Sequence, residues 1–159
     1  MGKNFVIFLL GAALGFTILL GLMFVMIPKM MLTVHQSKYG SVEETCVALQ
    51  ASIKAHGWNT PEIRNMNKTM ENSGVIMRRQ VRLVELCKAD YAKDILTTNP
   101  EVSTLMPCAW GVYEGEDGKV YVSGMNMGLM GKIFGGNIAK VMGGSVAKDE
   151  LSMLKDTIK

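Results

Sequence analysis

Uncharged residues run without interruption from Phe5 to Ile27, FVIFLLGAALGFTILLGLMFVMI, and Thr17 alone among them carries a polar side-chain group. A helix rises about 1.5 Å per residue, so a helix of this length covers roughly 35 Å, enough to cross a hydrocarbon core of about 30 Å. A helix also satisfies its own backbone N–H and C=O groups in lipid. The pattern predicts an N-terminal transmembrane helix that ends at Pro28.

Beyond this run, apolar and polar residues alternate or recur at the spacings of strands and amphipathic helices, as in a globular domain. Alternation between positions 30 and 37 predicts a first short strand. Ser41 and Glu44 then form a capping box, and apolar residues recur at helical spacing until Gly57, which predicts an amphipathic helix. Residues 59–74 are polar and predict an edge segment and loop with a short helical turn.

The middle of the chain predicts a strand, a helix and a hairpin. Apolar and β-branched residues crowd positions 75–87 and predict a strand, and residues 88–96 predict a short helix that ends before Asn99-Pro100. The stretches AWGVYE at 109–114 and KVYVS at 119–123 flank a turn rich in Gly and Asp. They predict two strands joined as a hairpin.

The last third of the chain changes in composition. Residues 125–144, MNMGLMGKIFGGNIAKVMGG, are rich in Gly and hold four of the 14 methionines, which predicts a pliable segment. A final helix is predicted from Val146. Its apolar face would hold Ala147, Leu151, Leu154 and Ile158, and its polar face would hold Lys148, Asp149, Glu150, Lys155 and Asp156.

These elements predict an α+β protein, in which a small antiparallel sheet is covered by helices and preceded by one transmembrane helix. Residues 1–28 would form a signal anchor and residues 29–159 a single domain, a usual size for one core. The apolar run is longer than the h-region of a signal peptide and lacks a small-x-small cleavage site, so we expect it to stay uncleaved. We expect a single-pass protein of the cell (inner) membrane with its domain in the periplasm or cell exterior. The lysines on the two sides of the apolar run hardly decide this orientation.

Two features of the composition bear on partners. The formal net charge is +3 with scattered basic residues and no stacking-aromatic pattern, which argues against nucleic acid. Gly11 and Gly15 form a GxxxG pattern within the apolar run, which favours transmembrane packing. The expected partners are therefore membrane lipid and a second copy of the chain in a homodimer, or another subunit of a membrane complex.

The three cysteines, Cys46, Cys87 and Cys108, show no CxxC or CxxCH spacing. Cys46 falls in the apolar stripe of the predicted helix and is expected in the core. Cys87 and Cys108 each lie at a strand end, and the short helix between them would return the chain, so they are expected to be neighbours. Inert packing, a disulfide, a redox pair and a soft-metal site shared with Met106 all remain open.

Methionines in the pliable segment offer a second candidate surface. Met125, Met127 and Met130 are close enough in sequence to share a site, either as thioether ligands of copper, with haem a further possibility, or as packing groups. A membrane-surface role is an alternative, with Lys132 and Lys140 at anionic headgroups. Its apolar face would comprise Leu129, Met130, Ile133, Phe134, Ile138, Val141 and Met142.

A family resemblance rests on motifs in one order with short gaps, spanning about residues 37 to 155. They are His56-Gly57-Trp58, Cys87, Tyr91-Ala92, Leu96, Met106-Pro107-Cys108, Val112-Tyr113-Glu114, Asp117-Gly118 and Asn126. The chain resembles the family catalogued as domain of unknown function 302. The resemblance implies a compact α+β domain, dimers among soluble relatives and an N-terminal anchor in some members, and it implies no activity and no catalytic residue.

No catalytic constellation stands out in the sequence, so an enzyme is not expected. The predicted function is a membrane-anchored, non-enzymatic binding or accessory domain that holds a partner subunit, a lipid or a small ligand, with no cofactor identified. The candidate ligand or partner surface comprises His56, Trp58, Met125, Asn126, Met127 and Met130. The alternative is a thiol-redox or soft-metal (copper or haem) protein that uses Cys87 and Cys108.

Overall fold

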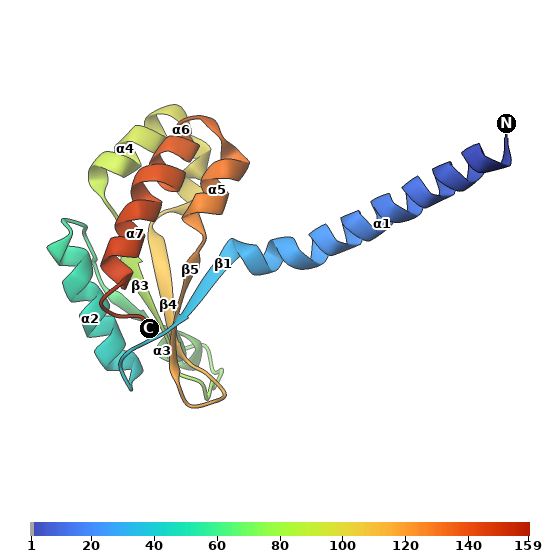
Figure 1. The fold of residues 1–159 in the computed structure, drawn as a ribbon. Coiled ribbons are helices and arrows are strands. Elements are labelled where there is room, and N and C mark those ends of the chain that lie inside the picture. The colour runs from blue at the N-terminus through green and yellow to red at the C-terminus, as the bar shows by residue number, and fades with distance from the viewer. Residues whose placement is uncertain (1) are drawn as a thin grey trace. The chain divides into compact units, whose positions relative to one another are not determined.

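The computed structural model describes residues 2–159, except for the side chains of residues 3, 4, 6, 24, 27 and 28. The chain divides into one unit that ends at Leu32 and a second unit, Thr33–Lys159. The second unit is an α+β domain whose five-stranded sheet has the order β1-β5-β4-β3-β2 (Figure 1). The predicted fold class of the globular part is confirmed.

The first unit is the helix α1, Lys3–Met31. Its described large apolar side chains are exposed, Phe8 to 69%. The helix continues past Pro28, so the prediction that it ends there is wrong; proline obstructs the turn before it more than the residues after it. Among the described residues, no helix is both long and apolar enough to cross a membrane. The predicted transmembrane helix is thus not confirmed, and Ile27 and Pro28, at the end of the predicted anchor, lie outside the described side chains.

The sheet is antiparallel. Its strands are β1 Leu32–Gln36, β2 Ile63–Asn65, β3 Val81–Leu86, β4 Cys108–Glu114 and β5 Val120–Met125. Adjacent pairs from β2 to β5 run antiparallel. The Ser37 N–H donates to the carbonyl oxygen of Val120 at 2.8 Å, and Thr33 Oγ1 donates to that of Gly124 at 3.3 Å. Because the residue numbers run in opposite directions across these two contacts, β1 is antiparallel to β5 as well.

Burial alternates along β3, β4 and β5, so helices cover one face of this sheet. The helices of the domain are α2 Val42–Ala55, α3 Met66–Glu71, α4 Ala89–Thr98, the 3-10 helix η1 Pro100–Leu105, α5 Met127–Phe134, α6 Gly136–Ile138, the π-helix η2 Ala139–Val146 and α7 Ala147–Leu154. The helices α2 and α7 pack against each other, and α2 also packs on β3 and β4. In Figure 1, α4, α5 and α6 gather at one end of the sheet, and α3 and the β4–β5 turn lie at the other.

The helix α2 and the β4–β5 hairpin form where the sequence predicts them. Ser41 caps α2, and its Oγ accepts a hydrogen bond from the Glu44 N–H at 3.2 Å. Gly57 follows the helix with φ +73°, the left-handed conformation that favours glycine. The face turned to the core buries Val42, Thr45, Cys46, Leu49 and Ile53.

The predicted strand over 75–87 is too long, because β3 begins only at Val81. The Asn67 side-chain amide donates to the carbonyl oxygens of Met77 and Arg79, at 3.0 and 2.7 Å. These backbone acceptors therefore bind a side chain and not a neighbouring strand. Ile76, in this segment, is 89% exposed.

Most of the segment 125–144 forms helices despite its glycines: α5, α6 and the larger part of η2. The glycines allow a close approach of two helices, since a Cβ at Gly131 would lie 2.6 Å from the Cα of Gly143. Much of the face expected to contact a membrane is in the core: Met130, Ile138, Val141 and Met142 are buried, whereas Ile133 and Phe134 are exposed.

The face that α7 presents to the core differs from the prediction. Glu150 is only 8% exposed and Leu151 is 70% exposed, so the predicted polar and apolar positions are exchanged at this pair. Val146, Met153 and Leu154 share the buried side with Glu150. The spacing of these residues keeps helical periodicity but is out of register with the predicted stripe.

Candidate functional site

A hollow of about 210 Å³ lies within the domain, between the edge of the sheet and α7. It is lined by Thr33 and His35 of β1, by residues 125–128 at the end of β5 and start of α5, and by Ala147, Glu150, Leu151 and Leu154 of α7. One water molecule needs roughly 10–15 Å³ of cavity volume, so the hollow is large enough for a ligand bigger than a few waters. We call it the Glu150 hollow.

Glu150 is the acidic residue that lines this hollow. The Trp110 indole Nε1–H donates to Glu150 Oε1 at 3.3 Å, and no other hydrogen bond to the carboxyl group is found among the described residues. Burial raises the pKa of Glu150 to about 7, and the indole hydrogen bond lowers it only in part. The carboxyl group therefore changes charge near neutral pH.

The geometry around Glu150 depends on a glycine in β5. A Cβ at Gly124 would lie 2.9 Å from Cδ1 of Trp110, closer than side chains tolerate. Trp110 is itself 2% exposed and has little room to move. The absent side chain thus lets the indole pack against β5 and aim its N–H at the carboxyl group.

Strand register places His35 at the same hollow. The contacts of Thr33 with Gly124 and of Ser37 with Val120 put His35 opposite Val122. Side chains directly opposite in adjacent strands share a face, and Val122 is buried beneath the helices. The described residues provide no hydrogen-bond partner for the His35 ring, which can serve as donor or acceptor.

The predicted cysteine site forms a separate and much smaller cavity. Cys87, Cys108 and Met106 all line a space of about 20 Å³, together with Trp58 and Tyr91. The three cysteines of the chain are free thiols. Among the described residues, no three His, Cys, Asp or Glu side chains lie close enough to hold a metal ion. The cavity has room for about one water.

Burial of Cys108 works against thiol chemistry. Desolvation, with smaller contributions from Glu150 and Cys87, raises the pKa of the Cys108 thiol to about 12. The thiolate is the reactive form, and its population at neutral pH is correspondingly small.

We expect Cys108 in the folded protein to react with iodoacetamide at least about a hundredfold more slowly than in the unfolded chain, because both burial and the raised pKa suppress the thiolate. Peptide mapping by mass spectrometry after timed labelling measures each cysteine separately, and the same chain in guanidinium provides the reference. Labelling at similar rates in the two states would show that Cys108 is a reactive thiol.

Asp149, next to Glu150 on α7, forms a polar cluster with three residues that line the cysteine cavity. Its Oδ2 accepts hydrogen bonds from Trp58 Nε1 at 3.0 Å, Lys88 Nζ at 3.3 Å and Tyr91 OH at 3.3 Å. The Lys88 ammonium also lies 4.6 Å from the centre of the Tyr91 ring. Partial burial raises the pKa of Asp149, but the hydrogen bonds from Trp58 and Lys88 outweigh it, and the net shift is downward.

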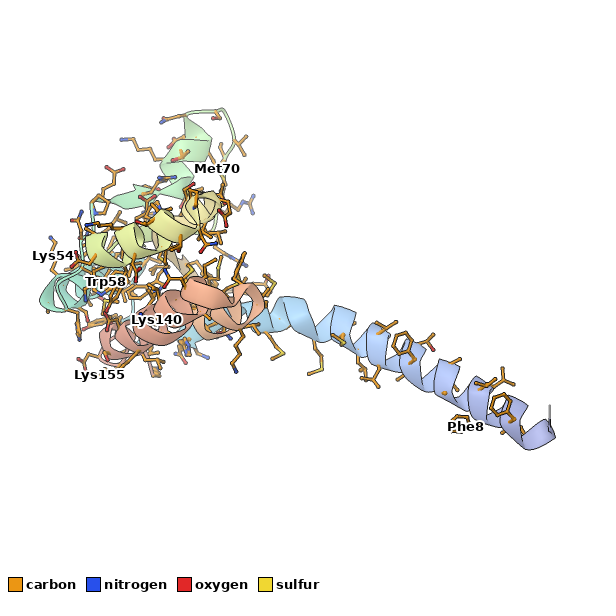
Figure 2. All side chains as sticks on the ribbon, turned by 90° about the horizontal axis from the view of Figure 1, so that it is seen from above. Phe8, Lys54, Trp58, Met70, Lys140 and Lys155 are labelled. Carbon is orange, nitrogen blue, oxygen red and sulfur yellow. The ribbon has the colours of Figure 1, made fainter. Side chains whose placement is uncertain are left out.

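The candidate surface residues separate into different places. Trp58, labelled in Figure 2, lies just beyond α2 and lines the cysteine cavity, whereas Met125, Asn126 and Met127 line the Glu150 hollow. Met130 is in the core. His56 is exposed at the C-cap of α2, where its ring Nδ1 lies 2.8 Å from the carbonyl oxygen of Ser52.

The remaining predicted positions are Cys46 in the core and the glycine pair of α1. Cys46 is 2% exposed, as expected for a core residue, and desolvation by burial raises the pKa of its thiol to about 11. A Cβ built at Gly11 or Gly15 meets no described atom within 4 Å, so this side of α1 is uncovered within its own unit. Sequence reasoning missed Glu150 and His35, and no motif marks either of them.

This chain is similar in fold to a solved structure and in sequence to a known family. A solved structure of an uncharacterised conserved DUF302 protein from Bacillus stearothermophilus has a TM-score of 0.69 at 17% identity, covering 79% of this chain and 97% of that one. No curated protein gave a significant match. The family model for "Domain of unknown function DUF302" matches residues 33–158, nearly the whole second unit. The chain belongs to the DUF302 family.

Proposed function

We propose that this protein is a binding domain whose small ligand occupies the Glu150 hollow. The observation that carries the proposal is a space of about 210 Å³ lined in part by Glu150, a buried residue whose carboxyl group has a single hydrogen bond among the described residues. A carboxylate can accept several more hydrogen bonds than the one that Glu150 has, and a donor group of a ligand could supply them. A concave, mostly apolar site with a few polar groups is the usual form of a small-molecule site.

Membrane attachment through α1 is the second part of the proposal. Phe5–Ile27 carries no charge, and its described large side chains are exposed, with Phe8 at 69% and Leu10 at 66%. Leaving such a surface in water is unfavourable by about 25 cal/mol per Å², so lipid or another apolar helix is expected to cover it. The domain would then act beside the membrane, and its location in the periplasm or at the cell exterior stays a prediction. The homodimer through Gly11 and Gly15 stays a prediction.

We expect the full chain to sediment with membranes, to be released by mild detergent, and to carry a small molecule that denaturation sets free for mass spectrometry. The variant Ala147→Leu, which fills part of the hollow, should release markedly less of it. Lys148→Ala, at the neighbouring exposed position, is the matched control and should behave as the unaltered chain does. Circular dichroism checks that each variant folds.

Equal release from Ala147→Leu and Lys148→Ala would place any bound molecule elsewhere. Release of nothing, together with no binding of added small molecules of any charge, would contradict the binding function itself. A chain found in the soluble fraction would contradict membrane attachment alone.

Thiol-redox chemistry at Cys87 and Cys108 is the second candidate. It is favoured by one observation, that both thiols line the same small cavity. The raised pKa of Cys108 weakens it, because thiol–disulfide exchange needs a thiolate. The labelling experiment on Cys108 separates the two candidates.

A further inference from the structure

We infer that the ligand of the Glu150 hollow is a small organic cation, a protonated amine with an apolar body. This assignment rests on the binding function proposed above and specifies its ligand class. It follows from three properties of the hollow: an acidic group without a cationic partner, apolar walls around it, and the absence of a donor set that a metal ion would need.

The acidic group is Glu150, and no lysine or arginine side chain that the structure describes forms an ion pair with it. The described residues lining the hollow include no lysine or arginine. The titratable groups on the neighbouring elements are His35 of β1, which lines the same hollow, and Cys108 of β4, whose thiol pKa the Glu150 charge helps to raise; the start of α5 contributes none. On α7 itself, Lys148 is exposed and Asp149 is turned to Trp58, Lys88 and Tyr91.

A buried carboxylate without a counter-ion attracts a positive ligand more strongly than a neutral or negative one. An N⁺–H donor would form a charge-assisted hydrogen bond to it, roughly twice as strong as a neutral one. The Trp110 indole already holds Oε1. The ligand's ammonium group would therefore meet a carboxyl group of fixed orientation.

The remaining walls suit the apolar part of such a molecule. Met127 and Leu154 are almost fully buried, and Leu151 stands exposed at the rim. Thioether and aliphatic side chains adapt to irregular apolar shapes. A hard metal ion would instead need several oxygen ligands, and the described residues contain no cluster of three His, Cys, Asp or Glu side chains to supply them.

Three probes of nearly one shape test the assignment: cyclohexylamine, cyclohexanol and cyclohexanecarboxylate. The full chain in detergent carries the substitution Trp58→Phe, which leaves Trp110 as the sole tryptophan and as a fluorescent reporter beside Glu150. At about pH 8 the amine should bind at least about tenfold more tightly than the alcohol, and the carboxylate should bind least. At about pH 5.5 this preference should shrink, because Glu150 is then protonated.

Two variants locate the effect. Glu150→Gln should reduce the preference for the amine over the alcohol to within about threefold while the alcohol still binds. Asp149→Asn removes the adjacent carboxylate, which faces away from the hollow, and should leave the preference unchanged. Both are made in the Trp58→Phe chain.

An amine that binds no more tightly than the alcohol, or a preference that survives Glu150→Gln, overturns the assignment. Saturable binding of the alcohol or the carboxylate in that case retains the proposed function and refutes only the ligand class. Absence of binding by all three probes refutes the ligand class, and if no molecule is released on denaturation either, the proposed function fails with it.

Discussion

Replacing Glu150 by Gln is expected to stabilise the folded domain by up to about 3 kcal/mol at pH values above 7, although it removes a charged group that has a hydrogen bond. The pKa of Glu150 is raised from 4.5 to about 7 by burial. Each unit of pKa corresponds to about 1.36 kcal/mol between the two protonation states, so ionising this carboxyl group costs the fold about 3 kcal/mol. Gln keeps an oxygen for the Trp110 indole and carries no charge.

The sign of the effect defines the experiment. Below about pH 4.5 Glu150 is protonated in both states and contributes nothing; between about pH 4.5 and 7 the unfolded chain ionises first, so stability falls as the pH rises. Urea unfolding of the full chain in detergent, followed by circular dichroism across this range, should show the two proteins diverging as the pH increases. Equal stability at all pH values would mean that the carboxyl group is solvated in the folded state.

Asp149→Asn provides a control of opposite sign on the same helix. The net lowering of the Asp149 pKa means that its ionised form stabilises the fold, and that this contribution is lost as the pH falls through the folded-state pKa. The variant should therefore be less stable than the unaltered chain at neutral pH, and the difference should disappear in acid. Opposite pH trends at adjacent positions could not arise from a general loss of helix stability.

A group that destabilises the fold when ionised is informative about function. Glu150 could be replaced by a neutral residue of similar size with a gain in stability, whereas the hollow would then lack its acidic group. Functional sites commonly combine local instability with chemical utility. The position of Glu150 at a hollow, together with its single hydrogen bond, accords with a ligand role and not with packing alone.

The sequence predicts those parts of the fold whose signals are local. The capping pair Ser41 and Glu44 sets the start of α2, and Gly57 marks the chain just past its end. The turn around Gly118 joins β4 and β5 as expected. The cysteine neighbourhood also follows from local order, because two strand ends and one short helix return the chain to its starting point.

The Glu150 hollow is not visible in the sequence because it depends on contacts between distant residues. Glu150 stands between Asp149 and Leu151, a setting that predicts a solvent-facing acid; its burial becomes evident only when Trp110 is placed against α7. His35 reaches the hollow through the pairing of β1 with β5, whose members are 91 residues apart where Thr33 meets Gly124. Neither relation leaves a periodic or motif signal.

The same limit applies to residues 125–144, where the many glycines predict a pliable segment. Glycine does lower intrinsic helix propensity by about 1 kcal/mol per residue. In this segment the loss is offset by packing, since α5 and η2 approach so closely that Gly131 and Gly143 are in backbone contact. Tertiary contact thus overrides propensity.

Gly131→Ala is expected to destabilise the domain by about 3 kcal/mol, the upper part of the range for overpacking a core. The added Cβ would lie 2.6 Å from Cα and 2.7 Å from the backbone nitrogen of Gly143, and 3.2 Å from Cα of Ala139. These are backbone atoms, so no side-chain rotation relieves the clash and η2 must move away from α5. Urea unfolding measures the change. It is done at about pH 6, where Glu150 is mostly protonated in the folded protein and the full cost of ionising it is not yet reached.

Gly128→Ala, one turn earlier on α5, is the matched control. Its Cβ would meet only Asn126 Oδ1 at 3.5 Å, an ordinary contact, so the better helix propensity of alanine should leave stability unchanged or raise it by up to about 1 kcal/mol. If both variants lost stability equally, α5 would need the backbone freedom of glycine and not the close packing at Gly131. A loss confined to Gly131→Ala would establish that close backbone packing holds α5 against η2. The same packing would also hold in place the part of the hollow's wall that Met127 and Gly128 of α5 form.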